Sequence, residues 1–288
     1  MPLTSVRRWR SWRTRAIEVI VVYVLLFLGA VALMIPFFWM LSTSLKPLDE
    51  VQSWPIKWIP SRLVWENYPR VFEKTPLARF MLNSTLLAVV GIVGNLIGST
   101  LAGFGFARMR FPGRDGLFLV MLSTLMLPQW VTIVPHFMMF KAVGWLDTYL
   151  PIMVPAFFGN AFYIFLCRQA FLGIPVELED AARIDGASSF RIYWQLFLPL
   201  TKPTLATVAI FAFYYYWNDL IYPLVYLQSQ MKFPVSLGLR MFQGANWGLV
   251  DFPLMMAASM ISLTPCLVLF FLAQRLFIQG VVVTGVKG

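Results

Sequence analysis

Long stretches without a charged residue constrain the fold of this chain more than any other feature. Residues 19–41 are uncharged and mostly apolar, and as a helix they extend about 35 Å, enough to cross the roughly 30 Å hydrocarbon core of a bilayer. Five similar stretches follow. Four of them are continuous: 80–107, 116–140, 148–167 and 252–274. The other begins as 203–218, is interrupted by Asp219 and continues to 231. The pattern predicts an all-α membrane protein with six transmembrane helices.

The composition agrees with a membrane protein and disfavours several other classes. Hydrophobic residues make up 59% of the chain and charged residues only 12%, about half the charged fraction of a typical soluble domain. A soluble enzyme, a disordered regulator and a fibre are therefore disfavoured. The net charge of +10 does not indicate nucleic-acid binding, because the basic residues cluster between apolar stretches, where Lys and Arg control membrane topology. Cys167 and Cys266 lie inside apolar stretches and are predicted to be small core residues.

The distribution of basic residues predicts the orientation. Five arginines precede the first apolar stretch, and that stretch is too long to be the core of a cleaved signal peptide. With the N-terminus in the cytoplasm, the inside segments hold fourteen Lys and Arg residues and the outside segments nine, the bias expected of cytoplasmic loops. We therefore expect a multi-pass protein of the cytoplasmic membrane with both termini on the cytoplasmic side.

The segment 42–79 differs from the rest of the chain. It contains Trp54, Trp58 and Trp65 together with five prolines, and Trp is favoured at the membrane–water interface. We expect a partly ordered extracytoplasmic arm that lies against this interface. The predicted organisation is a cytoplasmic basic tail, first transmembrane helix and arm (1–79), a five-helix core transmembrane domain (80–279) and a cytoplasmic C-terminal tail (280–288).

Motifs for nucleotide hydrolysis, metal binding and nucleophilic catalysis are absent from the sequence. No Gly precedes a Lys, which excludes a Walker A phosphate loop. His136 is the only histidine, so a metal site with two histidine ligands cannot form, and no Gly-x-Ser-x-Gly elbow accompanies it. The sequence therefore predicts a protein that is not an enzyme and holds no metal. His136 fits either a hydrogen-bonded packing residue or a proton relay.

Carboxylates within the predicted transmembrane helices are scarce. Glu18 lies at the boundary of the first helix, and Asp219 interrupts the fifth. An ion-coupled secondary carrier of a small polar solute usually keeps its coupling carboxylate within the bilayer. A single candidate is thin support, and the carrier remains as an alternative class.

Residues 173–203 form the longest inside segment, yet their sequence is helical rather than loop-like. Pro175 suits the first turn of a helix, and the acidic residues after it suit the positive end of the helix dipole. Gly186 can take the left-handed conformation that ends a helix, and Ser188 or Ser189 can cap a second helix. The pattern predicts two short cytoplasmic helices with a glycine corner. A capped surface helix that merely joins two transmembrane helices has the same local pattern.

Residues 180–199 resemble the EAA loop of permease subunits of bacterial ATP-binding-cassette importers. The residues that carry the resemblance are Asp180-Ala181-Ala182, then Gly186, and, after nine residues, Leu196-x-Leu198-Pro199. The family has Glu in place of Asp180 and Ile in place of Leu196. The run Ile-Asp-Gly-Ala at 184–187 and short matches elsewhere agree with the carbohydrate importers. Over nearly all of its length the chain resembles the MalG-type permease subunits of these importers, the binding-protein-dependent transport inner-membrane components.

This resemblance implies an importer of several chains in the bacterial inner membrane. The partners are a second permease subunit, two ATP-binding subunits, an extracytoplasmic solute-binding protein and membrane lipid; ATP and Mg²⁺ are used by the ATPase, and this chain binds no cofactor. The family's ATPase-docking positions correspond here to Glu177, Asp180, Ala181, Ala182, Asp185 and Gly186. ATPase closure is then expected to move the helix pair as a rigid lever that switches the cavity between inward- and outward-facing states.

Polar residues within the predicted helices are candidates for the path of a sugar or polyol, because amides bond hydroxyl groups and aromatic rings stack on sugars. The candidates are Asn83, Asn160, Trp217, Asn218 and Asp219. The aromatic run 214–217 equally fits an interfacial belt. Gly94 and Gly98 have a spacing that permits close helix contact, either within this subunit or with the second permease.

Overall fold

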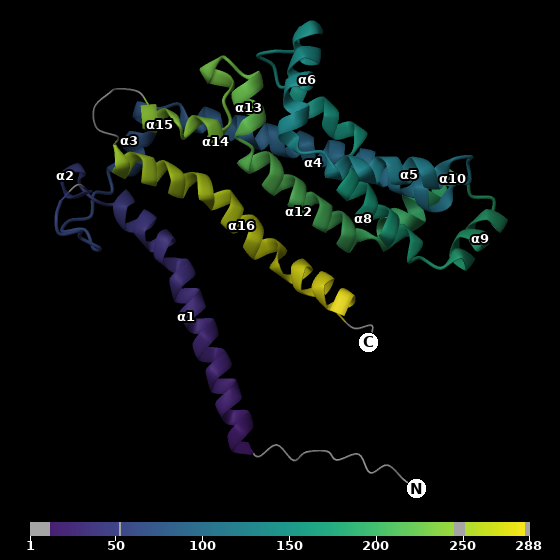
Figure 1. The fold of residues 1–288 in the computed structure, drawn as a ribbon, viewed down its shortest axis with the longest axis horizontal. Coiled ribbons are helices and arrows are strands. Elements are labelled where there is room, and N and C mark those ends of the chain that lie inside the picture. The colour runs from purple at the N-terminus through teal and green to yellow at the C-terminus, as the bar shows by residue number, and fades with distance from the viewer. Residues whose placement is uncertain (1–11, 52, 245–250, 286–288) are drawn as a thin grey trace. The chain divides into compact units, whose positions relative to one another are not determined.

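The computed structural model describes residues 12–51, 53–244 and 251–285 (Figure 1). All regular secondary structure in these ranges is helical. Within the described residues, four helices are long and apolar enough to cross a membrane, and the number rises to six if each of two bent helix pairs is one crossing. This confirms the predicted all-α fold and agrees with six crossings. The ends of the two predicted tails, 1–11 and 286–288, lie outside the described residues.

Contacts divide the chain into two units, 1–69 with 251–260 and 70–250 with 261–288. The first unit contains α1 (Trp12–Ser44) and α2 (Leu48–Val51). Residues 19–28 of α1 are exposed throughout, as expected of an apolar helix whose surroundings are lipid or another chain.

The arm that follows α1 is folded around a buried lysine. Lys46 is only 1% exposed; its Nζ donates to the carbonyl of Lys57 at 2.5 Å and lies 4.1 Å from the ring centroid of Trp39. Burial lowers the pKa of the Lys46 ammonium, because the charged form loses hydration. Asn67 holds the backbone before this lysine and at the lysine itself: its amide nitrogen donates to the carbonyls of Ser44 and Lys46, each at 3.0 Å.

The carboxylate of Glu50 holds a second turn of the arm. It accepts from the hydroxyl and the amide of Ser61 and from Lys57 at 3.4 Å. The Ser61 hydroxyl bond is the main cause of a lowered pKa for Glu50. The arm is therefore an ordered loop with its own polar core.

The second unit is built on α4 (Leu77–Arg108), the long helix against which α8 (Ala161–Leu172) and α12 (Lys202–Asn218) pack (Figure 1). Small residues bring the backbones together. A Cβ on Gly98 would lie 2.4 Å from the carbonyl oxygen of Phe157, so the Gly94–Gly98 face of α4 contacts this chain itself. Cys167 and Cys266 are buried free thiols, as predicted.

The third crossing is bent rather than continuous. One helix over 116–140 was expected, but α5 (Arg114–Ser123) and η1 (Thr124–Met126) meet α6 (Gln129–Ala142) at 102°. Pro128 explains the break, because it lacks an amide hydrogen and forces the residue before it out of the helical region. Leu127 accordingly has an extended ψ of 117°.

The remaining elements complete the second unit or extend into the first. The fourth crossing joins α7 (Leu150–Met153) and η2 (Val154–Phe158) to α8. The segments that follow are α9 (Val176–Ile184), α10 (Ser189–Ile192), the π-helical turn η3 (Tyr193–Phe197), α11 (Leu198–Leu200), α13 (Ile221–Tyr226), η4 (Gln230–Lys232), α14 (Val235–Gly238), α15 (Met241–Gly244) and α16 (Phe252–Gly285); α3 (Asn67–Lys74) precedes α4.

Candidate functional site

The predicted helix pair with a glycine corner is present. α9 begins directly after Pro175 and ends before Gly186, whose φ of 79° is in the left-handed region that glycine adopts without a steric penalty. Ser188 then caps α10 by accepting a hydrogen bond from the amide of Arg191 at 3.3 Å. Local capping chemistry is therefore sufficient to specify this corner.

The six residues predicted to dock on an ATPase lie on an open surface of the second unit. Glu177, Asp180, Ala181, Asp185 and Gly186 are exposed, and Ala182 is half-buried. Their faces are thus available to a companion chain. Docking itself stays a prediction.

The opposite face of α9 is fixed to the core by a residue that the sequence analysis did not select. Glu179 is 5% exposed. Its Oε2 lies 3.6 Å from Nη1 of Arg108, and its Oε1 accepts from Arg183 at 2.7 Å. The i, i+4 spacing of Glu179 and Arg183 is readable from the sequence. The contact with Arg108 is not, because it joins residues far apart in the chain.

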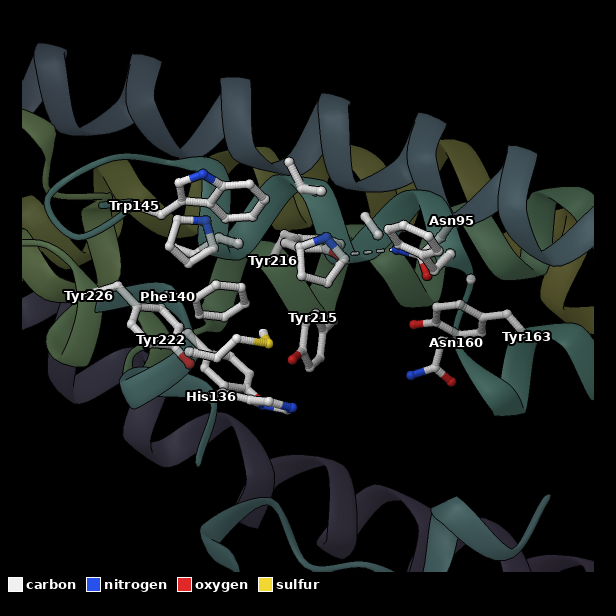
Figure 2. A pocket seen from close by; sticks show the side chains of 18 residues that line it. Asn95, His136, Phe140, Trp145, Asn160, Tyr163, Tyr215, Tyr216, Tyr222 and Tyr226 are labelled. Carbon is white, nitrogen blue, oxygen red and sulfur yellow. Dashed lines mark hydrogen bonds between the residues drawn. The ribbon is translucent and has the colours of Figure 1, made fainter. Parts of the chain in front are cut away.

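A cavity of about 530 Å³ lies within the second unit. Eighteen side chains from α4, α6, α8, α12, α13 and the segments between them line it (Figure 2). None of the eighteen is Asp, Glu, Lys or Arg, and five are tyrosines: Tyr163, Tyr215, Tyr216, Tyr222 and Tyr226. The lining therefore offers hydroxyl and amide groups and ring faces without a fixed charge.

The two ends of the cavity differ in character (Figure 2). At one end, Asn95 donates to the hydroxyl of Tyr216 at 3.1 Å, and Asn160 lies nearby at the start of α8, where its Oδ1 caps the helix. At the other end, Phe140 stacks on Trp145 with ring centroids 5.6 Å apart. A stacked pair of the same kind is formed by Tyr222 and Tyr226.

Of the five predicted substrate-path residues, Asn160 lines the cavity. The other four are not among its lining residues and make contacts within the fold. Asn83 donates to the carbonyls of Met231 and Phe233, both at 2.9 Å, and the Trp217 indole donates to the carbonyl of Ser262 at 3.2 Å. Asn218 bonds the carbonyl of Tyr214 within its own helix. Asp219 accepts hydrogen bonds from the amides of Ile221 and Tyr222 at the start of α13. A role of these four in solute transport stays a prediction.

Most of the residues that line the cavity were not predicted from the sequence. His136 is exposed and lines the cavity next to Phe140, and Tyr215 and Tyr216 belong to the run that also fitted an interfacial belt. Helical spacing alone does not reveal which face of an apolar transmembrane helix meets a cavity, since every face is apolar.

Two loops are joined at one end of this unit by Asp147, which has a positive φ of 54°. Its carboxylate accepts from the amides of Gln228 and Ser229 at 3.0 and 2.8 Å and from Lys232 at 2.9 Å. Hydrogen bonds from Ser229, the hydroxyl first, hold the pKa of Asp147 well below its usual range.

The Asp147 loop and α9 lie at opposite ends of α4. Asn83 holds residues 231–233 near the start of that helix, and Arg108, its last residue, contacts Glu179 of α9. Twenty-five residues of helix separate Asn83 from Arg108, a length of about 37 Å. That exceeds the roughly 30 Å hydrocarbon core, so the two loops are far enough apart to lie on opposite sides of a membrane.

Comparison with known proteins agrees with this geometry. Residues 94–283 match the family model described as "Binding-protein-dependent transport system inner membrane component". The chain is 34% identical over 230 residues to the arabinooligosaccharides transport system permease protein AraQ of Halalkalibacterium halodurans, covering 80% of this chain and 81% of that one. It is 30% identical over 266 residues to the lactose transport system permease protein LacG of Rhizobium radiobacter, covering 92% and 96%.

A solved structure is also similar over almost the whole chain. It is that of a bacterial ABC transporter involved in the import of the acidic polysaccharide alginate, with a TM-score of 0.83, 25% identity and coverage of 96% of this chain and 99% of that one. Family match, relatives and fold agree. This chain therefore belongs to the binding-protein-dependent transport system inner membrane components, the permeases of ABC importers whose ATPase is a separate subunit.

Proposed function

We propose that this permease carries a sugar or a related polyol across the inner membrane. The observation that supports this most is the cavity, whose lining combines tyrosine hydroxyls and asparagine amides with aromatic ring faces and has no Asp, Glu, Lys or Arg side chain. Such surfaces suit a ligand with many hydroxyl groups and apolar ring faces. Relatives named for arabinooligosaccharide and lactose transport are consistent with this cargo.

The energy for transport comes from ATPase subunits that bind the exposed face of α9. In this proposal α9 faces the cytoplasm, both termini do so as well, and the Asp147 end faces the extracytoplasmic solute-binding protein. A second permease completes the pathway, two ATP-binding subunits bind ATP and Mg²⁺, and this chain binds no cofactor. Alternating access is then a movement of α9 and the helices attached to it. An ion-coupled carrier is no longer needed to explain this chain, because the permeases of its family obtain their energy from separate ATPase subunits.

The test uses the complete importer in proteoliposomes with its solute-binding protein and a panel of labelled oligosaccharides. Tyr215 and Tyr214 offer a matched pair, since they are neighbours on α12 and only Tyr215 lines the cavity. We expect Tyr215→Phe and Asn160→Ala to raise the sugar concentration that gives half-maximal uptake by about 3- to 10-fold, equivalent to about 1 kcal/mol of lost hydrogen bonding. Tyr214→Phe is expected to leave it unchanged. An unaltered concentration dependence in both cavity variants contradicts the proposed path.

A further inference from the structure

Arg108 is the point at which four segments of the second unit meet. It is the last residue of α4, and its Nη2 donates to the carbonyl of Phe171 in α8 at 2.6 Å and to that of Ile174, which follows α8. Its Nη1 lies 3.6 Å from Glu179 of α9. Its guanidinium carbon is 4.9 Å from the ring centroid of Phe197 in η3. The side chain is 9% exposed, so it is largely shielded from water.

The partner of Arg108 on α9 faces away from the predicted docking residues. Glu179 and Ala181 are two positions apart, which is about 200° around a helix. Glu179 is accordingly buried, while Ala181 is exposed. A chain that presses on the Ala181 face therefore pushes α9 toward the side where Arg108 holds it.

The segment after α9 has its own attachment to α4. The hydroxyls of Tyr193 and Thr100 are 2.7 Å apart. Phe197 is fully buried and makes edge contacts with the rings of Phe104 and Phe171, at centroid distances of 5.1 and 5.6 Å. These contacts do not depend on charge, so we expect η3 to stay packed on α4 when the Arg108–Glu179 pair is removed.

We propose that Arg108 is a positioning residue that transmits displacement of α9 to α4 and α8, a proposal that rests on the proposed function of α9 as the ATPase-docking helix. The guanidinium joins the moving helix to the ends of two transmembrane helices through oriented hydrogen bonds and one buried ion pair. Glu179 is also held by Arg183 and Arg108 by two carbonyls, so both charges of the buried pair are fixed in position. Without it, α9 loses its ion pair with the end of α4, and its movement is taken up locally.

The experiment uses the full importer in proteoliposomes with its solute-binding protein. The variants are Arg108→Gln, Glu179→Gln, the double variant and the conservative Arg108→Lys; Arg110→Gln, an exposed arginine two residues away, is the control. Three quantities are measured: co-purification of the ATPase, the rate of ATP hydrolysis, and the amount of sugar taken up per ATP hydrolysed.

We expect Arg108→Gln and Glu179→Gln to retain the ATPase and to hydrolyse ATP within about twofold of the wild-type rate, while uptake per ATP falls at least tenfold. The double variant is expected to be no worse than either single variant, because both remove the same contact. Arg108→Lys is expected to keep part of the uptake per ATP that Arg108→Gln loses. The control Arg110→Gln is expected to keep the wild-type value.

Three outcomes overturn the proposal: normal uptake per ATP in Arg108→Gln, losses that multiply in the double variant, or loss of ATPase co-purification in the single variants, which assigns Arg108 to assembly instead. Failure of the docking function itself is seen separately. It appears as an ATPase that still co-purifies and drives uptake when Ala181→Arg obstructs the exposed face of α9.

Discussion

Nζ of Lys232 lies 2.9 Å from Oδ2 of Asp147, and this pair joins the loop after α6 to the segment after α13. The contact is partly exposed, with side-chain exposures of 40% and 26%, so its charge attraction is screened. Much of its geometry comes from the hydrogen bonds that Gln228 and Ser229 donate to the same carboxylate. It closes the end of the unit opposite to α9.

Asp147→Asn is expected to lower the stability of the purified complex at pH 7 by about 1 kcal/mol, the upper range for an exposed ion pair. Because folding lowers the pKa of Asp147, its contribution is fully present above the unfolded value of about 4 and is lost as the pH falls below it toward the folded value. Thermal unfolding of wild type and variant checks this. The difference in Tm should be constant between pH 5 and pH 8, and a difference that fades between pH 7 and pH 5 contradicts the assignment.

Two substitutions of Gly186 distinguish the effect of backbone strain from that of interference with ATPase docking. No atom lies within 4 Å of the position that a Cβ would take there, but the left-handed φ of 79° costs a non-glycine residue about 1 kcal/mol or more. Gly186→Ala is therefore expected to retain ATPase binding and most uptake. Gly186→Glu adds a bulky charge on the exposed corner and is expected to lose both. Co-purification and uptake measure this, and normal behaviour of the Glu variant would falsify the docking role.

Gly98 tests the contact between α4 and η2. A Cβ at this position would lie 2.4 Å from the oxygen of Phe157 and 2.5 Å from the nitrogen of Gly159, and backbone atoms cannot rotate away. Gly98→Ala is expected to destabilise the protein by about 1–3 kcal/mol. Gly105→Ala on the same helix meets nothing within 4 Å and is expected to be neutral or slightly stabilising. The Tm of the purified complex compares the two, and equal effects contradict the packing described here.

Features that depend on neighbouring residues were predictable from the sequence. The α9 corner follows from Pro175, Gly186 and Ser188, because capping and left-handed glycine act within one or two turns. The bend before α6 follows the same logic, yet it was missed because the apolar stretch was interpreted as one helix despite Pro128. Hydropathy shows whether an apolar stretch is long enough to cross a membrane, but it does not by itself reveal a break in the helix.

Features that depend on tertiary contacts were not predictable in this way. Arg108 carries the same topology signal as any arginine at the end of a transmembrane helix, and nothing local indicates that it contacts Glu179 and not the exposed Glu177. Asn160 was selected and lines the cavity, whereas Asn83 was selected for the same reason, a polar group in an apolar helix, and bonds two carbonyls of the fold. The sequence shows that a polar residue lies in an apolar helix, but only the packing of the fold shows which group it contacts.

Asn83 provides the last prediction, which separates a structural role from a place in the solute path. Its amide nitrogen satisfies the carbonyls of Met231 and Phe233 at a site that is 4% exposed. Asn83→Leu leaves both carbonyls without this donor and is expected to destabilise the complex by about 2 kcal/mol or more. Thr85→Ala, which removes only a bond to the helix's own backbone at an exposed position, is the control. Sugar concentration for half-maximal uptake is expected to stay at the wild-type value in both variants. If Asn83→Leu changes this sugar concentration and leaves the Tm unchanged, Asn83 belongs to the solute path, because the substitution then affects solute binding and not the stability of the fold.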